Sequence, residues 1–295
     1  MTISHLPRRW TCVLLAVLLF ILSLPAAGAA AGIPAAESDS VLIHILLIGQ
    51  DRREQDTFAR ADSIILCSFH PEEGRIIITS FPRDLYVSIP GHDSNRLNAA
   101  YAFGGMDLLR QTMEENLDLS LDGCIEADFS RFPQIIDALG GVSITLRQDE
   151  ADAINGATGG SLTAGTCLLS GDQALAYSRI RNLDSDGDLS RTARQRKLIY
   201  SLLSSYRSAD LLTILSVVVD MLPMVTTNLS KRQVLVLATK LFPLLDASVI
   251  TSQRLPADDS FSYDTIRGMS VITADMDLLR NQLQNSLFPE PESAS

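Results

Sequence analysis

Arginine and aspartate side chains gather in two segments of this 295-residue chain, between residues 49 and 98 and between residues 176 and 195. The candidate site residues of the first segment are Asp51, Arg53, Asp62, Arg83, Asp84 and Arg96. Those of the second segment are Arg179, Arg181, Arg191, Arg194 and Gln195. Arginine forks bind phosphate oxygens, and carboxylates bind a divalent cation that neutralises the remaining charge. Phosphoryl transfer needs mainly in-line positioning and charge stabilisation, so this composition favours phosphate chemistry.

The spacing of these charges along the chain predicts that they share a site. Asp51, Asp62 and Arg83 each lie at an end of a predicted apolar strand, where α/β folds place their ligands. The second segment contains the spacing i, i+3 and i+4, which puts three polar side chains on one helix face: Arg191, Arg194 and Gln195. Arginines outside this pattern are expected to form ordinary surface ion pairs, namely Arg52, Arg75, Arg110, Arg131 and Arg147.

Composition excludes several other classes of protein. The chain has 24 Lys and Arg residues, of which three are Lys, against 35 Asp and Glu residues, for a net charge of −11. Such an acidic chain lacks the basic face that nucleic-acid binding requires. A hydrophobic content of 46% is enough for a core and excludes general disorder. The phosphate-loop, dinucleotide, serine-elbow and HExxH motifs are absent and the four His are scattered, which argues against zinc sites and Ser-His-Asp catalysis.

The N-terminal segment predicts export. Residues 1–9 end in two arginines, and an uncharged stretch of 24 residues follows from 10 to 33. This stretch is long enough to span a membrane, while its apolar centre also suits a signal peptide, so a transmembrane anchor and a cleaved signal both remain open. In either case residues 1–9 stay in the cytoplasm and the rest is exported. The remainder divides into a linker over 34–40, a domain over 41–287 and an acidic tail over 288–295.

Export also permits a disulfide. Cys67 lies in a strand-like run and is expected in the core, whereas a pairing of Cys124 with Cys167 remains open.

Hydrophobic periodicity predicts a single α/β domain with helices layered around a sheet. Strands are predicted over Val41–Gly49, Ser63–His70, Arg75–Phe81, Gly123–Ala127, Val142–Leu146, Val249–Leu255 and Ser270–Ile272, with Leu85–Ile89 extending the sheet. Helices are predicted over Gly105–Leu117, Phe129–Leu139, Gly171–Tyr177, Leu189–Tyr206, Leu211–Met221, Ser230–Phe242 and Asp275–Leu287. Asn155–Gly165 is expected to be an exposed loop, and Pro243 is expected to stop the helix before it.

Seven motifs carry a resemblance to a known family. They are IGQDRR at 48–53, RADSI at 60–64, PRD at 82–84, RLNAAY at 96–101, DALGGV at 137–142, LSGDQALAYSRIR at 169–181 and GDLSRTARQ at 187–195. In this order they strongly resemble the LytR-CpsA-Psr family of cell-wall ligases, from about residue 41 to about 205, with a weaker match to about 287. The resemblance implies a three-layer α/β/α sandwich around a mixed sheet, outside the cell and usually behind one N-terminal span.

The resemblance also implies an activity. Members of this family transfer a phosphate-linked glycopolymer, of teichoic acid or capsule type, from an undecaprenyl pyrophosphate carrier to a sugar hydroxyl of peptidoglycan, with Mg²⁺. Two other functions remain open: a pyrophosphatase with water as the acceptor, and a non-catalytic module that binds lipid phosphate or wall polymer. The expected partners are thus the carrier-linked polymer, peptidoglycan and a membrane, and no nucleic acid.

Roles for individual residues follow from the matching motifs. Asp51 and Asp62 resemble the magnesium carboxylates, and either is a candidate general base. The diphosphate clamp is expected to consist of Arg83, Arg179, Arg181 and Arg191, with substrate-binding support from Arg53, Arg96, Arg194 and Gln195. Arg96 stands where the family often has Lys, which replaces a point charge with a fork. Asp84 is a candidate catalytic residue, either as a ligand or as an orienting partner for a neighbouring arginine.

Overall fold

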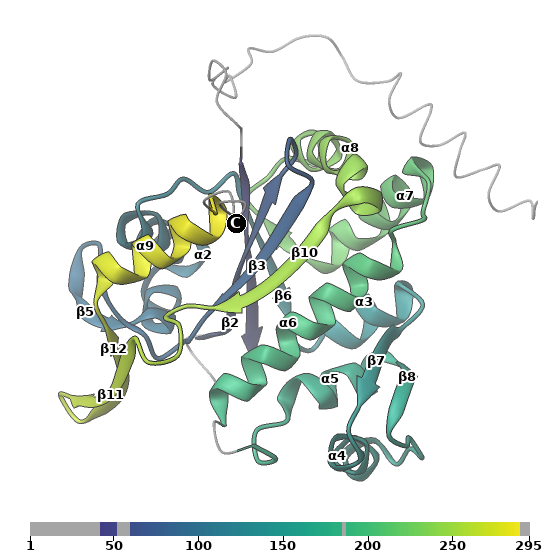
Figure 1. Cartoon of the computed structure of the whole chain (residues 1–295), viewed down its shortest axis with the longest axis horizontal. Helices are drawn as coiled ribbons and strands as arrows, with labels where there is room; N and C mark the ends of the chain where they lie inside the picture. The colour runs from purple at the N-terminus through teal and green to yellow at the C-terminus, as the bar shows by residue number, and fades with distance from the viewer. Residues whose placement is uncertain (1–41, 52–59, 185–186, 290–295) are drawn as a thin grey trace, which may run out of the picture. The chain divides into compact units, whose positions relative to one another are not determined.

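The computed structural model describes residues 42–51, 60–184 and 187–289 (Figure 1). The predicted N-terminal segments over 1–9, 10–33 and 34–40 and most of the predicted tail lie outside these residues.

A mixed sheet of six strands forms the centre of the domain, in the order β10-β3-β2-β1-β6-β9. Its strands are β1 (Ile43–Asp51), β2 (Arg60–His70), β3 (Arg75–Phe81), β6 (Gly123–Asp128), β9 (Thr226–Thr227) and β10 (Val249–Arg254). The pairs β1–β2, β2–β3 and β6–β9 are antiparallel, whereas β1–β6 and β10–β3 are parallel. The middle parts of the central strands are largely apolar because both faces of the sheet are covered.

Alternate residues of the strands divide between two apolar layers. On β2, Ile64 and Leu66 pack with the helices α2 (Leu97–Leu117) and α9 (Met276–Leu287). Ile65 and Cys67, one residue out of phase, face α6 (Asp188–Ser205) and α8 (Lys231–Ala247). This period of two gives the predicted three layers, with helices on both faces of the sheet (Figure 1).

A smaller apolar cluster supports the segment that carries Arg179 and Arg181. It is built from a hairpin and three short helices: β7 (Val142–Leu146), β8 (Gly165–Leu169), α3 (Phe132–Ala138), α4 (Gln148–Thr158) and α5 (Gly171–Arg179). Helix α5 begins with a capping box in which Ser170 and Gln173 satisfy each other's backbone N–H groups. The remaining elements are α7 (Leu211–Met221), the ribbon of β4 (Tyr86–Ile89) with β5 (His92–Arg96), and the hairpin of β11 (Phe261–Ile266) with β12 (Met269–Ala274).

Several predicted elements differ from the structure. Leu85–Ile89 does not extend the central sheet, because β4 pairs with β5 in a separate ribbon, and β7 likewise pairs only with β8. The predicted loop Asn155–Gly165 begins inside α4, whose residues Ala151 and Ile154 are buried against α5, and ends on the first residue of β8. Tertiary packing here outweighs the helix-breaking tendency of the local glycines.

Pro243 does not end its helix either, since α8 continues to Ala247. The proline is exposed, so the carbonyl that loses its hydrogen bond to a proline nitrogen lies where water can reach it. Cys124 and Cys167, whose pairing the sequence left open, do not form a disulfide in the structure. Cys67 is buried and also has a free thiol. Burial raises the pKa of the thiols of Cys67 and Cys124 to about 12.

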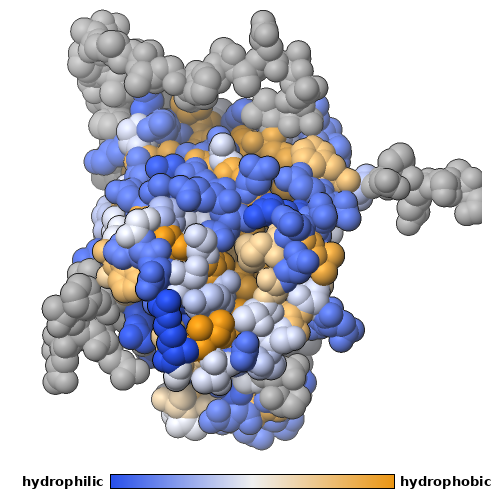
Figure 2. All heavy atoms as spheres, turned by 90° about the vertical axis from the view of Figure 1, so that its left-hand side faces the viewer, coloured by the Kyte–Doolittle hydropathy of each residue, from blue (hydrophilic) through white to orange (hydrophobic). Residues whose placement is uncertain are grey.

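Apolar side chains on the face that carries β5, α9 and the β11–β12 hairpin occur as separate spots among hydrophilic ones (Figure 2). Among the described helices, none is both long and apolar enough to cross a bilayer.

Candidate functional site

A β-bulge at the end of the β1–β2 pair aims Asp62 into the site. Gly49 pairs with Ser63 and Gln50 pairs with Ala61, so Asp62 has no partner on β1. A bulge of this kind bends the strand and redirects one side chain, which is why bulges recur beside active sites. Gly49 itself has little room, because a Cβ there would lie 2.9 Å from the Ser63 Cβ. The bulge therefore depends on a close approach that only glycine allows.

Two arginines from distant parts of the chain bind Asp62. Arg83 Nη1 donates a hydrogen bond of 2.6 Å to Asp62 Oδ1. Arg191 Nη2 donates one of 3.0 Å to the Asp62 backbone carbonyl, which the bulge leaves without a sheet partner. The end of β3 and the first turn of α6 are thus both fastened to the bulge.

Asp188 joins three guanidinium groups. Its carboxylate lies 3.0 Å from Arg191 Nη2, 3.4 Å from Arg83 Nε and 3.8 Å from Arg181 Nε. Asp62 also pairs with Arg83, so these three guanidinium groups face two carboxylates, which leaves an excess of positive charge at the first turn of α6. Such an excess favours the binding of an anion.

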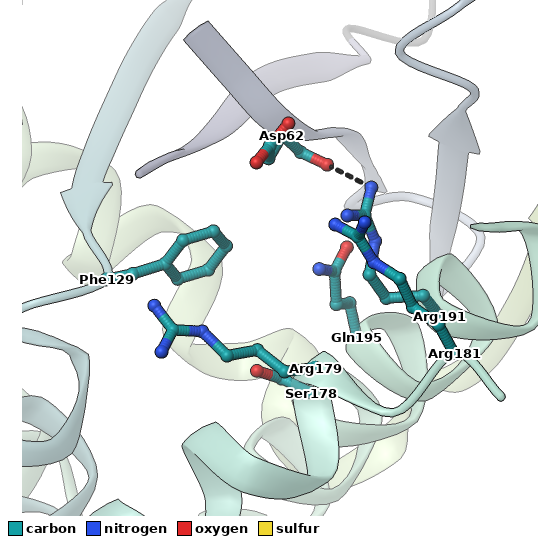
Figure 3. Close-up of a pocket in the computed structure, with 7 residues that line it drawn as sticks. All are labelled: Asp62, Phe129, Ser178, Arg179, Arg181, Arg191 and Gln195. Carbon is teal, nitrogen blue, oxygen red and sulfur yellow. Dashed lines mark hydrogen bonds between the residues drawn. The ribbon is translucent and has the colours of Figure 1, made fainter. Parts of the chain in front are cut away.

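A cavity of about 410 Å³ opens beside these groups, and we call it the arginine cavity. Its lining consists of Asp62, Phe129, Ser178, Arg179, Arg181, Arg191 and Gln195. Their side chains surround an open centre, with Asp62 on one side and the arginines and Gln195 around it (Figure 3). The Arg179 guanidinium lies over the Phe129 ring, 5.7 Å from its centroid.

Burial and the neighbouring charges shift the pKa values of two arginines at the arginine cavity in opposite directions. Burial lowers the pKa of Arg191 to about 10, and the nearby Arg181 and Arg83 act in the same direction against Asp188 and Asp62. Burial also disfavours the charged form of Arg83, but its hydrogen bond to Asp62 and the carboxylates of Asp188 and Asp84 outweigh this and raise its pKa. Both groups remain cationic at neutral pH.

Two buried polar atoms at the arginine cavity lack a hydrogen-bond partner among the described residues. They are Arg191 Nε and Gln195 Oε1, and both side chains line the arginine cavity. Buried polar atoms in native proteins are normally paired, so an unpaired donor and acceptor at one cavity indicate a polar ligand.

Helix α5 places Arg179 and Arg181 at the cavity through one close contact. The backbone N–H of Gly171 donates to Asp137 Oδ1 at 2.7 Å, and a Cβ at Gly171 would lie 2.1 Å from the Pro133 carbonyl oxygen. This approach locks the start of α5 against α3, so its last turn ends at the cavity.

The structure brings most of the predicted site residues together. Asp62, Arg179, Arg181, Arg191 and Gln195 line the arginine cavity, and Arg83 binds Asp62 and Asp188 at its edge. Asp84 Oδ2 lies 3.7 Å from Arg83 Nε, and its Oδ1 lies 3.4 Å from Arg96 Nη1. Arg96 is therefore linked to the arginine cluster only through Asp84.

Arg194 is not brought to the cavity. Its Nε lies 2.9 Å from Glu150 Oε1, its Nη1 donates to the Ile180 carbonyl at 3.3 Å, and its Nη2 binds Asp184. Arg191 and Arg194 share a broad face of α6, but the chain turns after α5 so that Arg194 meets α4 instead. With all three nitrogens occupied, Arg194 holds the segment after α5 rather than a ligand.

Two further predicted residues fall outside what can be described: Arg53 entirely, and the side chain of Asp51. The backbone of Asp51 pairs with Arg60, two residues before Asp62 on β2. Neighbouring antiparallel strands lie about 5 Å apart, so the Asp51 backbone is close to the bulge.

The prediction missed three residues. Asp188 lies in the second charged segment, between Arg181 and Arg191, and this position is a signal that its carboxylate pairs with several arginines. Ser178 lies inside the motif at 169–181 but was given no role there, and Phe129 lines the cavity without any sequence signal, because an apolar ring is common everywhere.

Among the described side chains, no group of three or more His, Cys, Asp or Glu residues is arranged to hold a metal ion. Asp62 alone of the two predicted magnesium carboxylates can be placed, with one of its oxygens bound to Arg83.

Comparison with known proteins connects this geometry to a family. The LytR_cpsA_psr family profile matches residues 34–286. The chain is 39% identical over 193 residues to the polyisoprenyl-teichoic acid–peptidoglycan teichoic acid transferase TagU of Oceanobacillus iheyensis. The aligned region covers 63% of this chain and 58% of TagU. The match therefore spans less than two thirds of that relative.

Solved structures share the fold. One described as TagT bound to LIIa-WTA has a TM-score of 0.68 and 30% identity, over 83% of this chain and 91% of that one. The LytR-CPS2A-psr family protein YwtF (TagT) with bound octaprenyl pyrophosphate lipid has a TM-score of 0.63 and 28% identity, over 83% of this chain and 90% of that one.

Proposed function

Because the chain belongs to the LytR-CpsA-Psr family, we propose that it transfers a phosphate-linked glycopolymer from a polyprenyl pyrophosphate carrier to a sugar hydroxyl of peptidoglycan. The polymer is of teichoic acid or capsule type. The observation that carries this proposal is the convergence of Arg83, Arg181 and Arg191 on Asp188 and Asp62 at the arginine cavity. The names of TagU and of the lipid-bound YwtF structure support the same chemistry.

The diphosphate of the carrier would occupy the arginine cavity, with Arg179, Arg181 and Arg191 around its oxygens. The acceptor hydroxyl gives up its proton, for which Asp51 or Asp62 is the candidate base, and its oxygen forms a new bond to the phosphorus next to the polymer. The phosphoanhydride bond breaks at the same time to release polyprenyl phosphate. Charge develops on the leaving phosphate, so fixed guanidinium groups that need no reorientation lower the barrier. Asp188 and Asp62 hold the guanidinium groups of Arg83 and Arg191 in place before the substrate arrives.

Magnesium is part of the proposal. Mg²⁺ in proteins is usually bound by one or two carboxylates together with substrate phosphates and water, which suits Asp62 with Asp51 on the neighbouring strand. When bound, the ion would neutralise charge on the diphosphate. Two observations support this assignment: Arg83 binds Oδ1 of Asp62 and not its Oδ2, as far as the described residues show, and the Asp51 backbone lies close to the bulge.

We propose that the polyprenyl chain binds along the exposed aliphatic surface of the helices α7 and α8. Helix α7 is mostly aliphatic, yet Ile214 is its only described residue that is fully buried, and α8 buries only Leu244. The side chains of Leu212, Val219 and Val236 are each more than 40% exposed. Exposed aliphatic surface on one helix pair indicates an apolar ligand, since it would otherwise remain in contact with water.

The proposal includes attachment to the membrane through residues 10–33, with the domain on the outer side. A single-pass anchor would keep the enzyme beside its lipid-linked substrate, and a cleaved signal would leave the exported domain to find it.

The decisive experiment incubates the full chain with a polyprenyl diphosphate-linked saccharide, with and without peptidoglycan, in Mg²⁺ or in EDTA. We expect the saccharide phosphate to become covalently attached to peptidoglycan only in Mg²⁺. Release of free saccharide phosphate despite the presence of peptidoglycan would instead establish a pyrophosphatase. Binding of the lipid without turnover at any Mg²⁺ concentration would establish a binding module.

A further inference from the structure

A second cavity, of about 400 Å³, lies between the β11–β12 hairpin and the first turn of α6. We call it the hairpin cavity. Asp84, Asp188 and Leu189 line one side of it, and Tyr263 and Ile272 of the hairpin line the other. Its two carboxylates belong to the arginine cluster already described, but the arginines of the first cavity do not line it.

The hairpin is fastened to the site rather than hanging free. The backbone N–H of Ile272 donates to the carbonyl of Asp84 at 2.9 Å, and Leu85 forms a β-bridge with Ile272. The backbone of Asp84 thus fixes the hairpin, while its side chain contacts Arg83 and Arg96. Tyr263 is the cross-strand partner of Ile272, which puts both side chains on one face of the hairpin.

Tyr263 is both exposed and held in position. Its side chain is 65% exposed, although it lines a cavity. The Phe261 ring packs edge-to-face against it at a centroid distance of 5.5 Å, and Arg254 covers Phe261 at 5.0 Å. A rigid, exposed ring above a cavity is a suitable platform for a ligand with an apolar face, because little side-chain freedom is lost on binding.

The charged groups that line the two cavities differ, so the two cavities suit different ligands. Guanidinium groups dominate the arginine cavity, whereas carboxylates are the charged groups of the described lining of the hairpin cavity. A diphosphate is attracted to the first, whose lining presents the guanidinium groups, whereas the second presents the carboxylates that pair with them. A neutral polyol fits the second, since hydroxyl groups donate hydrogen bonds to carboxylates and the C–H face of a sugar ring packs on an aromatic ring.

The two cavities meet at one ion-pair cluster. Asp188 lines the hairpin cavity and binds Arg191, which lines the arginine cavity, at 3.0 Å. In-line phosphoryl transfer requires the attacking hydroxyl and the leaving oxygen on opposite sides of the phosphorus. A separate cavity that adjoins the arginine cluster satisfies this requirement better than space within the arginine cavity itself.

We infer that the hairpin cavity binds the acceptor, an amino-sugar chain of the cell wall, with Tyr263 as its stacking platform and with Asp84 and Asp188 as hydrogen-bond acceptors for its hydroxyl groups. This inference rests on the proposed function, to which it adds the acceptor subsite. A larger cavity of about 830 Å³ next to Arg179 and Arg181 is a weaker candidate, because its described lining includes no aromatic side chain.

The test compares four forms of the full chain: wild type, Tyr263→Ala, Tyr263→Phe and Tyr200→Ala. Tyr200 is a matched control, because it is also an exposed tyrosine, at 40%, and lines none of the cavities described above. The first measurement is the KM of the transfer reaction for acceptor and for donor. The second is saturation-transfer NMR with an N-acetylglucosamine tetrasaccharide, without donor.

We expect Tyr263→Ala to raise the KM for acceptor roughly tenfold, which is the usual effect of truncating an aromatic contact, and to leave the KM for donor unchanged. Tyr263→Phe keeps the ring and should behave like wild type, as should Tyr200→Ala. An unchanged KM for acceptor in Tyr263→Ala overturns the inference. A rise in the KM for donor instead also overturns it, because the cavity would then hold the sugar of the donor.

The NMR measurement separates this inference from the proposed function. A wild-type chain that transfers nothing but binds the tetrasaccharide in a Tyr263-dependent way would refute the proposed transfer and support the hairpin cavity as a sugar site. Transfer by wild type that does not depend on Tyr263 would support the proposed transfer and refute the hairpin cavity as the acceptor site.

Discussion

Two clusters of arginines and carboxylates lie one helical turn apart on α6, and they differ in charge balance. In the first, at the arginine cavity, Asp188 serves three guanidinium groups, those of Arg83, Arg181 and Arg191. The second, which we call the Arg194 cluster, comprises Arg147, Asp149, Glu150, Asp184 and Arg194. The first has more cations than anions among its described members, and the second has more anions than cations.

The same difference appears in hydrogen bonding. All three nitrogens of the Arg194 guanidinium have a protein partner, and both oxygens of Glu150 are used, one by Arg194 and one by the Arg147 backbone N–H. Arg191, by contrast, keeps a buried Nε without a partner among the described residues. A cluster that satisfies itself stabilises the fold, whereas a cluster with unsatisfied cations is completed by an anionic ligand.

The largest effect expected from this comparison is the loss of stability in Arg194→Met. Removing the arginine would leave Glu150 charged, buried and without its main partner, so the free energy of unfolding should fall by about 3–5 kcal/mol. Urea denaturation measures this. The double variant Arg194→Met with Glu150→Leu should recover much of the loss. If Arg194→Met unfolds at the wild-type urea concentration, the cluster has no structural role.

Arg83→Ala should affect activity rather than stability. Its guanidinium is partly exposed and lies at the edge of the arginine cavity, bound to Asp62 and Asp188. Loss of one charge-stabilising donor typically lowers the rate by about 10²–10³-fold, or about 2.7–4 kcal/mol. The measurement is kcat/KM for transfer, with urea denaturation of the same variant as the control. Transfer at the wild-type rate would show that Arg83 does not belong to the diphosphate clamp.

Gly171→Ala tests how the two clusters are held relative to each other, because α5 connects α3 to Arg179 and then to the segment bound by Arg194. The new Cβ would clash with the Pro133 carbonyl oxygen, and overpacking of this kind costs about 1–3 kcal/mol. Both stability and transfer should fall, as judged by urea denaturation and kcat/KM. Gly156→Ala on α4 is the matched control, since a Cβ there meets nothing within 4 Å and should slightly stabilise the helix. Equal behaviour of the two variants would contradict the packing role of Gly171.

The smallest expected effect concerns His44, which lies on β1 away from both clusters and provides a baseline for pH. Burial lowers its pKa, with Asp122 opposing, and its Nδ1 lies 2.9 Å from Ser68 Oγ. The unfolded chain therefore binds the proton more readily, so this contribution to stability is complete above a pH of about 6.5 and declines as the pH falls below it.

The slope cannot exceed about 1.4 kcal/mol per pH unit for one group. Comparing the free energy of unfolding at about pH 7.5 and about pH 5.5 in wild type and His44→Gln measures it. We expect the variant to lose part of the decline between these two pH values. Identical declines in the two proteins would assign the pH dependence to other groups.

Most of the regular structure could be predicted from the sequence. The three adjacent strands β1, β2 and β3 each contain a largely apolar run, and a turn over 71–74 with Pro71 and Gly74 separates the last two, so their existence needed no tertiary information. Ion pairs of Arg75, Arg110 and Arg147 agree with the expectation for isolated arginines, whereas Arg131 donates to the Pro223 carbonyl and Arg52 lies outside the described residues. The helix α4 and the strands β8 and β11 were missed because their patterns are weak and their partners are distant.

The functional residues divide in the same way. Residue types and spacing determined, without coordinates, that the chain carries a phosphate-binding set of arginines and aspartates, since that chemistry is a property of the side chains themselves. Helical spacing alone could not tell that Arg191 faces a cavity while Arg194 faces Glu150, because one helix face is broad enough to touch two different neighbours. Only the tertiary structure decided this, together with the bulge that turns Asp62 inward and the meeting of Asp84, Asp188 and Tyr263 around one cavity, since each depends on contacts between segments far apart in the chain.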